Sequence, residues 1–172
     1  PIQISLVESL KQEGKDDYPV SADGVKTYPI LAISGGSANG AYGAGLLKGW
    51  SKAGTRPVFK VVTGVSTGSI TAPLAFLGSE YDDLLEEVYT TVSTKDIMRP
   101  RMPFAVMFSD SLASNKPLEK YIRMIATPEI LKKIAKEHLR GRRLYVGTVN
   151  LDAQKFVVWD MGAIAIRGDE KL

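Results

Sequence analysis

Hydrophobic and polar positions along the chain repeat a strand, turn and helix order. Short apolar runs at 30–33 and 58–63 each end at a glycine-rich turn, as buried parallel strands do. Each turn leads into a segment of helical spacing, 40–53 and 70–77, whose residues are mostly small or apolar. The pattern therefore predicts two consecutive strand-turn-helix units.

More elements are predicted downstream. Apolar residues at helical spacing predict three amphipathic helices, over 80–92, 118–125 and 129–139. Two β-rich runs, 144–150 and 155–159, flank a short segment with turn residues and predict a hairpin. All these elements together predict an α/β fold with a mainly parallel sheet and an antiparallel addition near the end.

Two stretches show no clear periodicity. Residues 1–28 are mixed and polar, and they predict an N-terminal arm that packs on the body formed by residues 29–172. Residues 98–112 are apolar and interrupted by proline. They either line an apolar cleft or form a loop that packs onto the core, and the hydrophobic periodicity does not distinguish the two.

Composition is that of an ordinary globular domain. The chain has 172 residues, of which 44% are hydrophobic and 24% are charged, and it contains no cysteine. The missing cysteines exclude disulfides, a cysteine nucleophile and cysteine-ligated zinc, and a core of this size needs no such bridges. No apolar run in the sequence is long enough to span a membrane.

Neither the net charge nor the first residue of the sequence determines the binding partners or the location of the protein. The net charge is +3, and basic residues form short groups such as Arg140, Arg142 and Arg143. Such a group either contacts an anionic surface or forms a solvated helix end. The chain opens at Pro1 without a signal-peptide core, so we expect any targeting segment to have been removed or to lie outside it. Membrane-associated and secreted locations both remain open.

The motif with the clearest chemistry is the turn at residues 64–68. It reads Gly-Val-Ser-Thr-Gly and fits Gly-x-Ser-x-Gly between a strand and a helix. A sharp turn of this kind strains the serine backbone and requires glycine two residues before and after it, here Gly64 and Gly68. The hydroxyl of Ser66 then lies over a helix N-terminus, whose N–H groups favour a developing anion. We therefore predict Ser66 as a nucleophile.

The glycine-rich turn at residues 34–40 offers N–H donors for an oxyanion, which acyl transfer requires. A phosphate cradle is the alternative, but the nucleotide fingerprints do not fit. Gly-x-Gly-x-x-Gly started at Gly43 meets Lys48 at its last position, and a P-loop ending at Gly40 continues into Ala41 instead of lysine.

At these two turns the sequence resembles the patatin-like phospholipases, and bacterial members in particular. Their signature is an oxyanion loop Gly-Gly-Gly-x-Arg/Lys-Gly followed by Gly-x-Ser-x-Gly, and Gly35 precedes Ser66 by 31 residues here. Ser37 stands at the third glycine and Asn39 at the basic position, which are the two departures. The likeness runs from about residue 30 onward.

The resemblance implies a three-layer α/β/α sandwich and hydrolysis of phospholipid or lysophospholipid acyl esters through a Ser-Asp dyad and an acyl-enzyme. It implies no metal or other cofactor. Its partners are an acyl-ester lipid and, through it, peripheral contact with a membrane, with no role for nucleic acid. In this scheme the N–H groups of Gly35, Gly36 and Thr67 lie near the oxyanion, and Gly40 closes the loop.

The dyad aspartate of the family has no counterpart in this sequence. The family places it in Asp-Gly-Gly or Asp-Gly-Ala after the last strands, whereas the Asp-Gly of this chain, at residues 23–24, precedes the serine. Asp160, two residues before Gly162, is a poor substitute because the motif around it does not match. We therefore expect the chain to stop before the dyad acid.

A histidine triad is the remaining alternative for the base. His138 is the only histidine, and the order Ser66, Asp110, His138 is formally that of an α/β-hydrolase. Because His138 lies in a charged helix, we expect it at the surface or at the helix end. Three functions stay open: a lipid acyl hydrolase, an acyltransferase with the same nucleophile, and a non-catalytic piece that binds lipid or protein.

Overall fold

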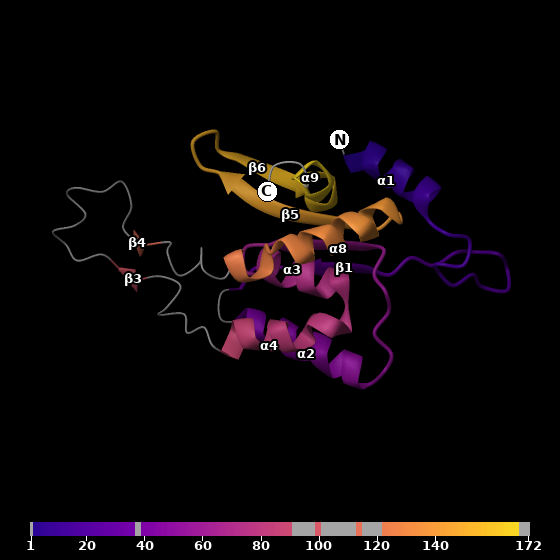
Figure 1. Ribbon diagram of the computed structural model, residues 1–172, viewed down its shortest axis with the longest axis horizontal. Coiled ribbons are helices and arrows are strands. Elements are labelled where there is room, and N and C mark those ends of the chain that lie inside the picture. Colours follow the sequence, from indigo (N-terminus) through magenta and orange to yellow (C-terminus); the bar gives the residue numbers. More distant parts are fainter. Residues whose placement is uncertain (1, 37–38, 91–98, 101–112, 115–121, 169–172) are drawn as a thin grey trace.

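Figure 1 shows the computed structural model of the chain, which describes residues 2–36, 39–90, 99–100, 113–114 and 122–168. Its elements are α1 (Ile2–Gln12), β1 (Ile30–Ile33), α2 (Gly40–Lys52), β2 (Val61–Val65), α3 (Gly68–Leu77), a 3₁₀ turn (Ser79–Tyr81), α4 (Asp82–Thr90), β3 (Arg99–Pro100), β4 (Ala113–Ser114), α8 (Pro128–Leu139), β5 (Arg143–Asn150), β6 (Lys155–Asp160) and α9 (Met161–Gly168).

The main sheet has four strands in the order β1-β2-β5-β6. The first three run parallel, and β6 returns antiparallel to β5. This confirms the predicted mainly parallel sheet with an antiparallel hairpin at its end. Since β1 and β2 are parallel neighbours, the two glycine-rich turns that follow them lie at the same edge of the sheet.

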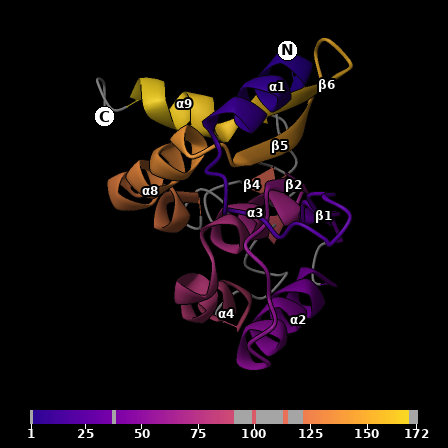
Figure 2. The same ribbon diagram turned by 90° about the vertical axis from the view of Figure 1, so that its right-hand side faces the viewer.

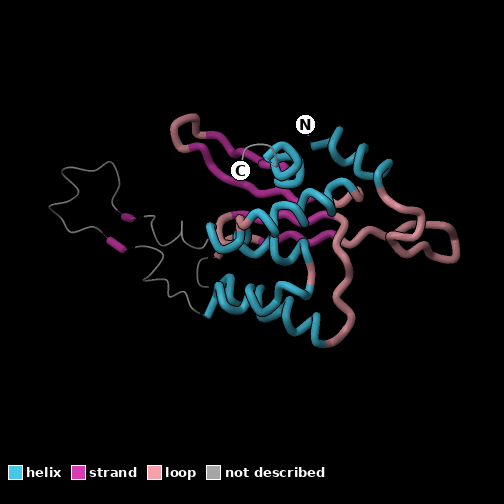
Figure 3. Tube along the Cα trace, viewed as in Figure 1, coloured by secondary structure: helices cyan, strands magenta, loops and turns pink. Residues whose placement is uncertain are grey.

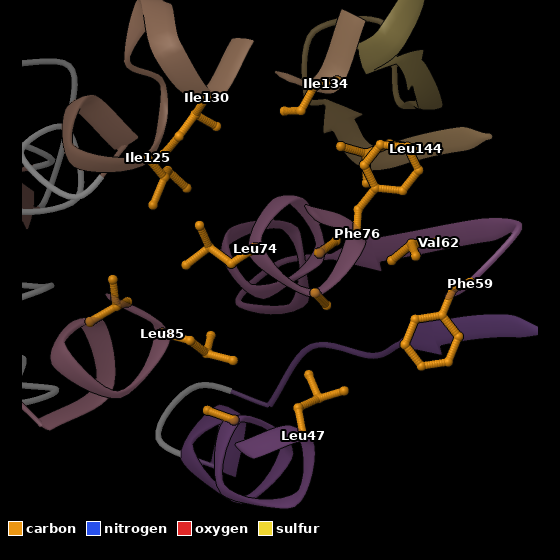
Figure 4. Close-up of a cluster of buried hydrophobic side chains, with 14 of the residues drawn as sticks. Leu47, Phe59, Val62, Leu74, Phe76, Leu85, Ile125, Ile130, Ile134 and Leu144 are labelled. Carbon is orange, nitrogen blue, oxygen red and sulfur yellow. The ribbon is translucent and has the colours of Figure 1, made fainter. Parts of the chain in front are cut away.

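Helices flank both faces of this sheet (Figures 2 and 3). On one face Val62 and its partner Leu144 belong to the main core, together with Phe76 of α3 (Figure 4). Ala72 of α3 belongs to the same core. Successive residues of a strand point to opposite faces. Arg143 accordingly points away from this core, and it hydrogen-bonds Ser5 of α1 on the far side.

The central helix of the core is α3. Its residues from Thr71 to Phe76 are all buried, as expected for a helix that is apolar on every side. Pro73 lies inside it, and the helix nevertheless continues to Leu77. The helices α2 and α4 contact each other and also contact α3, so α3 lies between them and the sheet region around β2 and β5.

The N-terminal arm contains a helix that the hydrophobic pattern did not predict. The polar side of α1 faces the protein: Ser9 is fully buried and donates to the carbonyl of Gly141. Its apolar residues Ile4 and Leu10 are instead 59% and 52% exposed. Because apolar periodicity locates a helix by its buried apolar side, a helix docked through polar groups leaves no such signal.

The basic group at 140–143 occupies two different environments. Arg140 is exposed, with 58% of its side chain accessible. Arg142 donates to the carbonyls of Phe59 and Phe76, and Arg143 is completely buried and donates to the carbonyl of His138. Both interpretations of this group, an anionic contact and a solvated helix end, are therefore wrong for Arg142 and Arg143.

Several predicted boundaries shift. The second strand begins at Val61 instead of residue 58 and extends to Val65, because its pairing starts opposite Ile30. The helix predicted at 80–92 is divided into the 3₁₀ turn and α4. The irregular segment 98–112 lies outside the described residues apart from 99–100, and of the helix predicted at 118–125 only 122–125 is described, as helix.

A buried ion pair ties the arm to the sheet. Lys60, directly before β2, pairs with Glu13 and donates to the carbonyl of Ser9, and the two side chains are 4% and 7% exposed. Burial alone would raise the pKa of the Glu13 carboxyl. Hydrogen bonds from Lys60, Tyr28 and Lys26 outweigh that effect and lower the pKa to about 2.

The depressed pKa makes a prediction about acid stability. Glu13 contributes stability that is complete above its ordinary pKa of 4.5 and is lost as the pH falls toward about 2. We expect Glu13→Gln to lower the free energy of unfolding at neutral pH by about 3 kcal/mol, because Lys60 then keeps a buried charge without its partner. The loss should shrink toward acid pH in urea unfolding curves.

The matched control is Glu80→Gln, because Glu80 pairs with Lys133 at the surface and its side chain is 59% exposed. Exposed pairs contribute little to stability, so this control should unfold like the parent at every pH. Equal losses in the two variants would contradict a special role for the buried pair.

Candidate active site

Ser66 sits at the turn between β2 and α3. Its φ of 56° lies in the left-handed region, and among the described residues Gln154 is the only other non-glycine residue with a positive φ. The side chain is exposed to solvent. A serine held in this conformation at a strand-to-helix turn has the strained geometry of a nucleophile elbow.

The glycines of the turn are required by close backbone contacts. A Cβ atom on Gly64 would lie 2.3 Å from the carbonyl oxygen of Gly68. A Cβ atom on Gly68 would lie 2.4 Å from the carbonyl oxygen of Ile33. No side chain fits in either place, so the start of α3 is pressed against the ends of both β2 and β1.

The loop after β1 passes directly beside the serine. A Cβ atom on Gly35 would lie 2.7 Å from Cβ of Ser66 and 3.3 Å from its Oγ. Asn39 donates its N–H to the carbonyl of Gly36 at 3.0 Å, which turns the chain into α2. The structure thus brings the predicted residues Gly35 and Ser66 together, while residues 37–38 lie outside its description.

Thr67 caps the N-terminus of α3. Its carbonyl accepts the N–H of Ile70 at 3.1 Å and the hydroxyl of Tyr89 at 3.2 Å. Its own Oγ1 is buried and bonds no partner among the described residues. The position of Thr67 is therefore fixed through its carbonyl. The turn is closed by the N–H of Ser69, which donates to the carbonyl of Ser66 at 2.9 Å.

Gly40 has a different neighbour from the other motif glycines. It is the first residue of α2, and a Cβ atom on it would lie 2.6 Å from the hydroxyl oxygen of Tyr89. Tyr89 therefore touches both glycine-rich turns, a contact that the sequence did not predict. In the sequence, Tyr89 is marked only as one of several residues at the apolar positions of an amphipathic helix.

Asp160 does not reach Ser66. It pairs with Tyr145 across β6 and β5, and Tyr145 pairs with Thr63, which precedes Ser66 by three residues. Asp160 and Ser66 are thus separated by roughly 10 Å across the strands and roughly 10 Å along them. Its carboxylate accepts the hydroxyl of Ser5 and the N–H of Ala163, so it caps α9 and holds α1.

His138 is at the end of α8 as predicted, but the expected surface position is wrong. It is buried with 8% exposure, because α9 packs over it with Gly162 against the imidazole ring. Burial lowers the pKa of His138, and its Nδ1 lies 3.5 Å from Asp160. Asp110, its formal partner in a triad, lies outside the described residues.

A cavity of about 730 Å³ lies at the opposite end of α3 from the serine. Its lining includes Phe59, Gly78, Lys136 and Arg142. Ser66 and the residues of its turn are not part of this lining. The cavity is therefore separate from the site built around the two glycine-rich turns.

The described part of the chain contains neither a membrane-spanning helix nor a cluster of metal ligands. No helix there is both long and apolar enough to cross a bilayer. The described residues also contain no group of three or more histidine, cysteine, aspartate or glutamate side chains placed to hold a metal ion.

An α/β sheet that presents a strained serine on a strand-to-helix turn is typical of serine hydrolases. A match to a known family narrows this class. The model of the patatin-like phospholipase family matches residues 31–163, so the chain belongs to this family. Membership supports lipid acyl hydrolase activity in general terms.

Comparison with individual proteins adds less. The crystal structure of the type III effector protein ExoU is similar to this chain at 18% identity with a TM-score of 0.36, over 86% of this chain and 41% of ExoU. The chain therefore spans less than half the length of that protein. No curated protein sequence matches the chain.

The close contacts of the turn predict a sharp difference between two glycines. Gly68→Ala places a methyl group where the carbonyl oxygen of Ile33 lies, so we expect loss of folding or a drop of about 3 kcal/mol in the free energy of unfolding. Gly45→Ala on α2 meets nothing within 4 Å and should stabilise the protein slightly, because alanine favours helix. Thermal unfolding of both variants would check this, and equal melting temperatures would contradict it.

Proposed function

We propose that this chain is the nucleophile-bearing part of a serine lipid acyl hydrolase, with Ser66 as the nucleophile. One observation carries the proposal: Ser66 is exposed, has a φ of 56°, and lies against the backbone of Gly35. A bulkier residue at position 35 would collide with the serine side chain.

The proposed reaction proceeds in two steps. The hydroxyl oxygen of Ser66 attacks the ester carbonyl of the lipid, its proton passes to a general base, and the carbonyl oxygen becomes an oxyanion. The N–H groups of Gly35, Gly36 and Thr67 stabilise this oxyanion, and loss of one such donor costs about 3 kcal/mol. The alcohol part of the lipid takes up a proton and leaves, and water then hydrolyses the acyl-enzyme.

The general base of the family is an aspartate, and no residue of this sequence is assigned to that role. Asp160 is committed to Ser5 and α9, and the imidazole of His138 is packed under Gly162. The proposed substrate class is a phospholipid or lysophospholipid, on the basis of the family membership. Peripheral contact with a membrane follows from such a substrate.

The proposal is tested by the change Ser66→Ala in the full-length protein. We expect hydrolysis of a fluorogenic acyl ester and labelling by a fluorophosphonate to fall to background, because both reactions need the Ser66 oxygen. Ser79→Ala is the control, since Ser79 is exposed at the opposite end of α3. It should keep the parent rate. Parent activity in the Ser66 variant would refute the assignment.

The same probe separates the alternatives. Labelling of Ser66 within the 172-residue chain would show that the nucleophile is reactive without further residues. If this chain stays unlabelled and a longer form of the protein is labelled, the base lies outside these residues. Acyl transfer to an added alcohol, seen in the products, would favour an acyltransferase over a hydrolase.

A further inference from the structure

Tyr89 in the last turn of α4 contacts the two backbone segments that the proposed oxyanion site needs. Its hydroxyl donates to the carbonyl of Thr67 at 3.2 Å, directly after the nucleophile. Its ring lies against Gly40, where an added Cβ would be 2.7 Å from the nearest ring carbon. Gly40 begins α2 at the end of the loop that carries Gly35 and Gly36.

The hydrogen bonds around this hydroxyl have one consistent arrangement. Tyr89 has a single hydroxyl proton, and the carbonyl of Thr67 can only accept, so Tyr89 donates there. The hydroxyl of Thr71, which is 1% exposed, lies 2.7 Å from the Tyr89 oxygen and must then donate to it. Burial raises the pKa of Tyr89, so its hydroxyl stays protonated and able to donate at neutral pH.

The elbow and the oxyanion loop also touch directly, because Gly35 lies against Ser66 and Gly68 lies against the carbonyl of Ile33. The N–H of Thr67 belongs to the elbow at the start of α3, whereas the N–H groups of Gly35 and Gly36 belong to the loop before α2. Tyr89, from a third helix, α4, contacts both segments with one side chain. Their separation determines whether donors from both can reach one oxyanion.

We propose that Tyr89 is a positioning residue that sets the spacing between the elbow and the oxyanion loop, an inference that rests on the proposed function. It does not touch the reacting atoms. The same arrangement requires glycine at position 40, because a side chain there would push the tyrosine away from Thr67. A displacement of about 1 Å in such a site can reduce the rate a hundredfold.

The test is a set of three variants of the full-length protein assayed with a p-nitrophenyl ester. Tyr89→Phe keeps the ring against Gly40 and removes the bond to Thr67, so we expect kcat to fall about tenfold with KM nearly unchanged. It also leaves the buried Thr71 hydroxyl without its acceptor, which lowers the melting temperature.

Two further variants separate position from stability. Tyr89→Phe with Thr71→Val removes both hydroxyls, which should restore the melting temperature while kcat stays low. Thr71→Val alone keeps the bond from Tyr89 to Thr67, so kcat should remain within about twofold of the parent. Tyr42→Phe is the matched control, because Tyr42 is 78% exposed on the same helix as Gly40.

The possible results are distinguishable. If Tyr89→Phe keeps the parent kcat, or if kcat recovers with the melting temperature in the double variant, Tyr89 has a structural role only and the inference is overturned. In that case Ser66 labelling by a fluorophosphonate still supports the nucleophile. If the parent shows no turnover that depends on Ser66, the proposed function fails and the inference fails with it.

Discussion

The close approach of three backbone segments around Gly68 is the constraint on which the rest of the structure depends. Gly68 at the start of α3 lies against the carbonyl oxygen of Ile33, and its own carbonyl oxygen lies against Gly64, with no room for a Cβ atom on either glycine. This contact joins β1, β2 and α3 at one point. Since α3 is the most deeply buried helix described, its position in turn fixes where α2, α4 and α8 can pack.

The two faces of the sheet are held by different kinds of interaction. Toward α3 the strands present Val62 and Leu144, both completely buried, and the contacts are apolar. Toward α1 they present Arg143, whose guanidinium bonds backbone and side-chain oxygens instead of an acid. Burial accordingly lowers the pKa of Arg143, and the several oxygens around it compensate for the lost water.

The sequence predicted the parts of the fold that bury apolar side chains. The strand-turn-helix units, the hairpin and the strained serine follow from apolar runs and from glycine spacing, and all of them are present. The pattern could not predict α1, because Ser5 and Ser9 rather than leucines face the protein. Arg142 and His138 were misjudged for the same reason: their burial depends on carbonyls and on Gly162, which lie far along the chain.

The candidate site likewise contains residues that the sequence predicts and residues that it does not. Ser66, Gly64 and Gly68 could be predicted as site residues because a local turn dictates their identity, and Gly35 because it belongs to a short motif. Tyr89 was missed because its partners, Thr67 and Gly40, are 22 and 49 residues away in the sequence. Contacts between residues so far apart in the sequence produce no periodic pattern. They can be recognised only when the positions of the helices in space are known.

The docking of α1 also has a consequence for the order in which the chain folds. In the described chain α1 precedes the sheet, yet three of the groups that hold it, Gly141, Arg143 and Asp160, are more than 130 residues further on. Lys60 is made earlier, but until these three groups emerge from the ribosome α1 lacks most of the polar surface that it docks against, and a short isolated helix is marginal in water. The α1 segment therefore joins the native structure late, after the sheet that it covers.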